Sequence, residues 1–159
     1  MRYLEKIVAS SDIVTIVAQA RRAGRRVAFT NGCFDLLHVG HVRYLAAARD
    51  AADLLIVGVN DDASVQRLKG PSRPLVPEAA RAEVVAALAA VDYVTLFAED
   101  TPYDLIRAIE PDVLAKGSDW AADQVVGRDV VEARGGRVLL VPVVAGFSTT
   151  TLLDRLRGG

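Results

Sequence analysis

Apolar residues along the chain follow two alternating spacings. Helical spacing appears first over residues 10–23, where a Ser/Asp start precedes the run and Gly24 supplies a stop. The same spacing predicts further helices over residues 40–51, 61–67, 78–91, 101–110, 121–134 and 148–157. Short, continuously apolar runs between them predict strands over residues 26–30, 53–60, 93–97, 112–116 and 137–144. Strand and helix therefore alternate along most of the chain.

Strands that are apolar on both faces indicate parallel pairing, with helices covering each side of the sheet. We therefore expect an α/β fold, a single doubly wound, Rossmann-like domain with a parallel sheet of about five strands. Ligands of such sheets bind outside the carboxyl ends of the strands. The chemistry is thus expected in the loops after the strands, over residues 30–40, 60–77, 98–101, 116–121 and 145–149.

Composition narrows the class of partner. A chain of 159 residues, 52% hydrophobic and 25% charged, is one ordinary globular domain. Its formal net charge of −1 gives no general attraction to nucleic acid or to an anionic membrane. No apolar run approaches the ~20 residues that span a bilayer, and the first residues lack the apolar core of a secretory signal. The single cysteine, Cys33, fits a reducing cytoplasm, where we expect this protein to act.

Lysine is rare in this chain compared with arginine. Only Lys6, Lys69 and Lys116 are present, against 16 arginines. Because arginine supplies the general surface charge, Lys69 and Lys116, each followed by glycine, are candidates for a compact point charge beside an open backbone. The alternative is that both are solvated loop lysines.

The stretch "TNGCFDLLHVGH", from Thr30 to His41, joins the first predicted strand to a helix and contains both histidines of the chain. A helix N-terminus presents free N–H groups and a partial positive charge, which together favour a phosphate. His38 and His41 are three residues apart and share a helix face, so both can reach one ligand. Gly40 between them leaves room for a polyphosphate against the backbone.

Two other interpretations of this stretch remain open. One histidine could cap the helix while the other is exposed to solvent. Alternatively, the pair could bind zinc, although only Cys33 and Asp35 are near enough in sequence to complete such a site.

The longer stretch "FTNGCFDLLHVGHVRYL" resembles the signature of the cytidylyltransferase-like nucleotidyltransferases, whose hallmark is His-x-Gly-His. The P-loop pattern Gly-x-x-x-x-Gly-Lys-Ser/Thr is absent, as is the Gly-x-Gly-x-x-Gly of dinucleotide-binding oxidoreductases. Further stretches resemble the adenylyltransferase domain of the bacterial heptose pathway: "VGVNDDASVQRLKGPSRPLVP", "RAEVVAALAAVDYVTLFAEDTP", "LAKGSDW" and "GFSTTTLLDRL".

This resemblance implies a reaction. The family domain uses ATP and D-glycero-D-manno-heptose 1-phosphate to make ADP-heptose and pyrophosphate, with Mg²⁺ carried largely by the nucleotide phosphates. That domain is often fused to a sugar kinase; this chain resembles its stand-alone form, so a separate heptose kinase is an expected pathway partner. Residues 1–25 would be an N-terminal helical extension and residues 26–159 the nucleotidyltransferase domain. The resemblance also admits a homo-oligomer.

The resemblance and the loop positions together suggest site residues. The catalytic candidates are His38, His41 and Lys69. The nucleotide-binding candidates are Thr30, Asn31, Gly32, Phe34, Gly40, Lys116, Gly117, Asp119, Phe147, Ser148 and Thr149. The candidates for the sugar phosphate side are Asp35, Asp61, Asp62, Arg73 and Arg81. No carboxylate cluster predicts a protein-built metal site.

Several of these residues also have purely structural interpretations. Ser148 and Asp61 are good helix N-caps, and Arg81 is equally consistent with a solvated helix face. Asp35 could orient the histidine loop or meet magnesium through water. At the level of the whole protein, the alternatives are a cytidylyltransferase for glycerol 3-phosphate or another small phosphate, and a non-catalytic nucleotide-binding regulator.

Overall fold

The computed structural model describes residues 1–157, without the side chains of residues 122 and 154–157. Its centre is a parallel sheet of five strands in the order β3-β2-β1-β4-β5. The strands are β1 (Val27–Gly32), β2 (Leu54–Asn60), β3 (Tyr93–Phe97), β4 (Val113–Gly117) and β5 (Arg137–Val141). The strand order reverses direction between β1 and β4. The predicted doubly wound α/β fold is confirmed.

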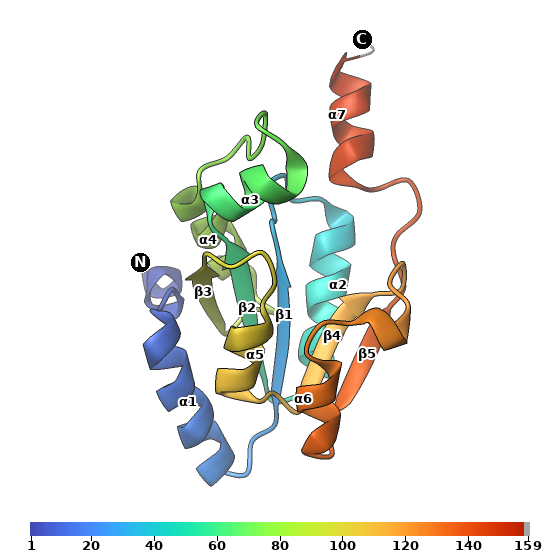
Figure 1. Cartoon of the computed structure of the whole chain (residues 1–159). Coiled ribbons are helices and arrows are strands. Elements are labelled where there is room, and N and C mark those ends of the chain that lie inside the picture. Colours follow the sequence, from blue (N-terminus) through green and yellow to red (C-terminus); the bar gives the residue numbers. More distant parts are fainter. Residues whose placement is uncertain (158–159) are drawn as a thin grey trace.

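Helices cover both faces of the sheet (Figure 1). The helices α2 (Val39–Asp50) and α4 (Glu78–Ala86) pack on one face, and α1 (Ser10–Arg22), α5 (Tyr103–Ile109) and α6 (Arg128–Ala133) pack on the other. Successive residues of a strand point to opposite faces, so Ala28 joins the first core and Phe29 the second. Burial on both faces explains why the strands are continuously apolar in sequence.

The N-terminal residues pack on the sheet. Ile13, Val17 and Ala20 of α1 are buried in the same core as Phe29. Ahead of α1, the 3₁₀ helix η1 (Arg2–Lys6) was not expected from the sequence. Packing on the sheet is what the apolar face of α1 requires, while a boundary at residue 25 stays a prediction.

Two elements depart from the expected ranges because of single residues. The helix expected over residues 121–134 is instead η2 (Ala122–Gln124) and α6, separated by a turn in which Gly127 has φ of 86°. This left-handed conformation interrupts a helix and suits glycine. The last strand ends at Val141 rather than at residue 144, because Pro142 has no N–H to donate to the sheet.

Two helices differ from expectation at their ends. The helix α4 ends at Ala86, short of residue 91. The helix α5 begins at Tyr103, two residues after the expected start at residue 101, with Pro102 as its N-cap residue and no capping side chain.

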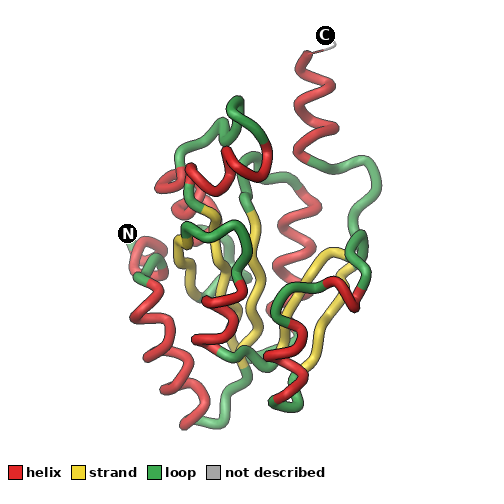
Figure 2. Tube along the Cα trace, viewed as in Figure 1, coloured by secondary structure: helices red, strands yellow, loops and turns green. Residues whose placement is uncertain are grey.

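The remaining helices, α3 (Asp62–Lys69) and α7 (Thr149–Arg157), lie at the carboxyl edge of the sheet, where α7 projects from the body of the domain (Figure 2). Among the described residues, no helix has both the length and the apolar composition needed to cross a bilayer.

Candidate active site

The loops after the strands surround a cavity of about 710 Å³ at the carboxyl edge of the sheet. This volume is typical of small-molecule sites. Its lining includes most of the expected site residues: Asn31, Gly32, Phe34, Asp35, His38, Gly40, His41, Lys69, Arg73, Lys116, Gly117, Asp119, Phe147, Ser148 and Thr149. The cavity therefore brings together five loops that are distant in sequence.

The histidine pair is organised by the start of α2. His38 is the N-cap residue, with extended backbone, and its N–H donates to Nδ1 of His41 at 3.4 Å. The two ring centroids are 3.9 Å apart. A Cβ on Gly40 would lie 2.9 Å from the His38 ring, so a side chain there would displace it. The Gly40 backbone thus lets both rings face the cavity together.

Both imidazoles are neutral near pH 7. Burial lowers the pKa of His38, and burial followed by the charge of His38 lowers the pKa of His41 to about 4. Since Nδ1 of His41 accepts a hydrogen bond, the proton of its neutral ring is assigned to Nε2. His41 can therefore donate from Nε2 to an oxygen in the cavity. Nδ1 of His38 is buried and has no partner among the described atoms.

The lowered histidine pKa values predict a loss of stability in mild acid. The unfolded chain binds protons at its imidazoles below about pH 6.5, whereas folded His41 binds one only near pH 4. Stability conferred by the neutral rings is therefore complete above about pH 6.5 and is lost as the pH falls toward 4. Thermal melts at pH 7 and 5 should show a smaller decrease in His41→Gln than in the wild type. An equal decrease in both would contradict the assignment.

Phe34 lies beside His41. It is buried, and its backbone is left-handed, with φ of 48°, which is uncommon for a non-glycine residue. Its ring centroid lies 5.4 Å from that of His41, and its edge lies 3.1 Å from where a Cβ on Gly32 would be. A side chain at Gly32 would therefore crowd the Phe34 ring beside His41.

Asp35 holds the proline-rich loop rather than the histidines. Its carboxylate accepts from the N–H groups of Leu75 and Val76 and from Nε of Arg73 at 2.5 Å. Burial would raise its pKa, but the two N–H bonds and the Arg73 cation lower it overall. Both carboxylate oxygens of Asp35 therefore have hydrogen-bond partners within the protein. Within the described residues, no group of three His, Cys, Asp or Glu side chains is arranged to bind one.

Four expected site residues lie outside the cavity lining and have internal partners. Thr30 is buried, with its hydroxyl 2.5 Å from that of Tyr44. Asp61 caps α3 by accepting from the N–H of Ser64. Asp62 pairs with Arg81 at 2.7 Å.

Arg81 is 1% exposed, so the solvated helix face considered for it is wrong. Its guanidinium donates to the carbonyls of Cys33 and Val76 as well as to Asp62. Arg81 therefore connects the loop between β1 and α2, which holds Cys33, with the loop that follows α3, which holds Val76. These three contacts account for the burial of the Arg81 guanidinium without any contact to a substrate.

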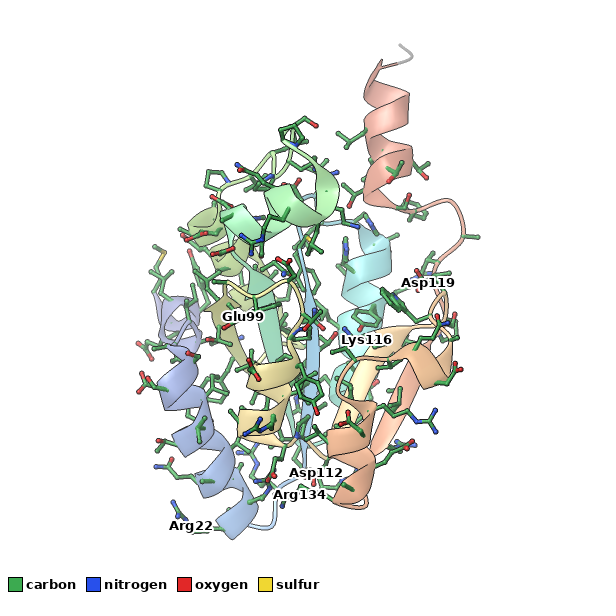
Figure 3. All side chains as sticks on the ribbon, in the orientation of Figure 1. Arg22, Glu99, Asp112, Lys116, Asp119 and Arg134 are labelled. Carbon is green, nitrogen blue, oxygen red and sulfur yellow. The ribbon has the colours of Figure 1, made fainter. Side chains whose placement is uncertain are left out.

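The two candidate lysines lie in different parts of the cavity. Lys69 ends α3 and is exposed at the rim. Lys116 is the last residue but one of β4, beside β1, and donates from Nζ to the side-chain oxygen of Asn31. Figure 3 shows Lys116 near Asp119 at this edge of the sheet. Asp119 lies so close to Gly117 that a Cβ there would collide with its carboxylate.

The start of α7 also lines the cavity. Ser148 caps this helix by accepting from the N–H of Thr151 at 3.0 Å, as the structural interpretation proposed. The ring centroid of Phe147 lies 6.4 Å from that of His38. Because Ser148 and Thr149 also line the cavity, capping leaves phosphate contact open to them.

Sequence reasoning missed two polar residues of the site. Tyr44 donates from its hydroxyl to the carbonyl of Ala115 and so links α2 to β4; burial raises its pKa to about 12. Asn60, at the end of β2, also lines the cavity. Both could have been found from the sequence. Tyr44 lies three residues after His41 on the same helix face, and Asn60 is a polar residue at the end of an apolar strand.

Relatives of known sequence match nearly the whole chain. It is 60% identical over 98% of its length to the bifunctional protein HldE of Rhodopseudomonas palustris (strain BisB5), and 61% identical over the same share to that of Bradyrhizobium diazoefficiens. Each match covers 32% of the relative, so the chain spans about a third of the length of these curated relatives.

Solved structures share the fold of this chain, and one family model matches most of its length. A lipopolysaccharide core biosynthesis protein from Thermoplasma volcanium superposes with a TM-score of 0.62 at 28% identity, covering 76% of this chain and 98% of that one. A pantoate-beta-alanine ligase from Francisella tularensis shares the fold, with a TM-score of 0.63 at 13% identity over 94% of this chain and 72% of that one. The cytidylyltransferase-like family model matches residues 29–151. This protein therefore belongs to the cytidylyltransferase-like family.

Proposed function

We propose that this protein is a nucleotidyltransferase that transfers AMP from ATP to D-glycero-D-manno-heptose 1-phosphate, giving ADP-heptose and pyrophosphate. The observation that carries the proposal is the pair of neutral imidazoles, His38 and His41, whose ring centroids lie 3.9 Å apart at the N-terminus of α2. They face a cavity of nucleotide size where the strand order of the sheet reverses. Such a position is the usual ligand site of doubly wound sheets.

The reaction needs placement and charge stabilisation more than proton transfer. An oxygen of the sugar 1-phosphate is already ionised near neutral pH. It attacks the α-phosphorus of ATP, the new P–O bond forms, and the bond to the β-phosphate bridging oxygen breaks, so that pyrophosphate leaves with the electron pair. No water is consumed. In-line displacements of this kind are accelerated chiefly by positioned donors and cations.

Several residues of the chain match these requirements. Nε2–H of His41 donates to the α-phosphate oxygens, on which charge must be stabilised in the transition state. Lys69, which is exposed and lines the cavity, would bind the departing β- and γ-phosphates. The free N–H groups at the start of α7 offer a second anion-binding helix end. We expect Mg²⁺ to arrive with ATP as the MgATP substrate, because Mg²⁺ in phosphoryl-transfer sites is bound largely by the substrate phosphates.

The choice of ATP and heptose rests on similarity. The histidine motif recognises phosphates and carries no information about the base. The 60% identity to the bifunctional protein HldE and the resemblance of "NDDAS" and "KGSDW" to the heptose-pathway adenylyltransferase domain support this choice over a cytidylyltransferase.

A pyrophosphate-release assay tests the proposal. The purified protein is incubated with Mg²⁺, each of ATP, CTP and GTP, and each of the two anomers of D-glycero-D-manno-heptose 1-phosphate or glycerol 3-phosphate. We expect release with ATP and one heptose 1-phosphate anomer, with ADP-heptose identified by mass spectrometry. Faster release with CTP and glycerol 3-phosphate would establish the cytidylyltransferase instead. No release with any pair would favour the non-catalytic regulator.

A further inference from the structure

Lys116 lines the cavity at the point where β4 and β1 run side by side. It is partly buried and is the last residue but one of β4. Its ammonium donates to the side-chain oxygen of Asn31, the last residue but one of β1. The pair therefore spans the two strands between which the strand order reverses. Figure 3 labels Lys116 near this end of the sheet.

Lys116 has no carboxylate partner among the described side chains. The basic side chains of Lys or Arg that line the cavity are Lys69, Arg73 and Lys116. Arg73 is neutralised by Asp35, and Lys69 is exposed to water. Lys116 is partly buried and has only a neutral partner, and burial lowers its pKa to about 8. A partly buried cation with no counter-ion is costly, and an anionic ligand would remove that cost.

The contact with Lys116 also sets the orientation of the Asn31 amide. An ammonium group can only donate, so Asn31 must turn its oxygen toward Lys116. Its Nδ2 group then points away from the ammonium as a donor. Asn31 lines the cavity as well. The pair thus offers two kinds of donor to the same space, one charged and one neutral, and no acceptor besides the one already occupied.

We propose that Lys116 and Asn31 form a phosphate-binding floor that holds one of the two reacting phosphates beneath His41. This inference rests on the proposed function, because the reaction brings the α-phosphate of ATP and the phosphate of the acceptor together at one point. Two phosphates brought together in this way repel each other, and a nearby cation reduces the repulsion. The only other unpaired lysine or arginine in the described lining is Lys69, which is exposed. The shared ligand chemistry is a phosphate group from either substrate.

Steady-state kinetics test the proposal and separate the two sources. In Lys116→Gln we expect kcat/KM to fall about 10- to 100-fold for the substrate whose phosphate occupies the floor, as for the loss of a hydrogen bond from a charged group. The KM of the other substrate should be unchanged. Asn31→Asp should produce a similar or larger decrease, because the new carboxylate pairs with Lys116 and repels phosphate. Arg22→Gln, the same charge change on an exposed arginine at the far end of the molecule, should not alter either parameter (Figure 3).

Proton uptake supplies a readout that a structural role would not move. A phosphate bound beside Lys116 raises its pKa, so at about pH 8.5 ligand binding should draw a proton from the buffer. The other titratable groups lining the cavity are Cys33, Asp35, His38, His41, Tyr44, Lys69, Arg73, Asp100 and Asp119. At this pH both imidazoles are neutral, because the pH lies well above their pKa values. The Tyr44 hydroxyl stays protonated, because its pKa lies well above the pH.

Titration calorimetry in two buffers of different ionisation enthalpy measures this uptake. MgATP and D-glycero-D-manno-heptose 1-phosphate are titrated separately into the wild type, Lys116→Gln and Lys69→Gln. We expect uptake with one of the two ligands in the wild type and in Lys69→Gln, and none in Lys116→Gln. Uptake that is equal in all three proteins would overturn the proposal, even if pyrophosphate release proceeds.

The two proposals fail separately. If the wild type releases no pyrophosphate, the proposed function is wrong, but the calorimetric comparison with MgATP and inorganic phosphate still decides whether the floor binds a phosphate. If pyrophosphate is released and Lys116→Gln keeps wild-type kcat/KM for both substrates, the phosphate-binding floor is wrong and the proposed function stands.

Discussion

Replacing His41 by alanine is expected to lower kcat by about 10²- to 10³-fold. Nε2–H of His41 would donate to an α-phosphate oxygen most strongly in the transition state, and the loss of one such donor typically costs about 3–4 kcal/mol. A single-turnover experiment with saturating MgATP and heptose 1-phosphate isolates the chemical step from product release. The decrease should appear there in full. Near-wild-type turnover in this experiment would remove His41 from the mechanism.

The variant should fold normally, which makes the kinetic result interpretable. His41 is only partly buried, and the one hydrogen bond to its side chain in the described structure is the long contact from His38. Because the fold lowers the pKa of His41, the histidine destabilises the folded protein in acid. Alanine does not titrate and removes this effect. Combining it with His38→Ala gives a further check. If the two rings act on one phosphate as a unit, the double variant should lose much less than the product of the two single losses.

The fold and the histidine site could be predicted because both are written in local patterns. Each buried strand is a continuous apolar run, and each covering helix has one apolar face. His38, Gly40 and His41 act through contacts within four residues. Their position at the carboxyl edge follows from the parallel sheet alone.

The partners of charged side chains could not be predicted in the same way. Asp35 and Arg73 are 38 residues apart, and Arg81 meets Cys33 across 48. Sequence shows that such residues are charged, but only the packing of α4 against the histidine loop decides that Arg81 is buried. Residues assigned to substrate by their loop position can therefore be internal supports.

Replacing Arg81 by methionine is expected to destabilise the protein most among these substitutions. Methionine keeps the apolar stem but leaves the carbonyls of Cys33 and Val76 and the carboxylate of Asp62 without their donors. Breaking a buried charged network of this kind costs about 3 kcal/mol. For a chain of this size that corresponds to a decrease in Tm of about 6–12 °C. Differential scanning calorimetry measures it directly.

A matched control separates burial from charge. Arg128→Met removes the same charge from an exposed pair with Glu132, one turn away on α6, and should barely move Tm, because water replaces the lost partner. Arg81→Lys keeps the charge but replaces a planar guanidinium, which reaches three oxygens, by a single ammonium, so it should recover only part of the stability. Equal Tm values for Arg81→Met and Arg128→Met would mean that the network adds nothing to the fold, and the 70–77 loop would then have to be positioned by Asp35 alone.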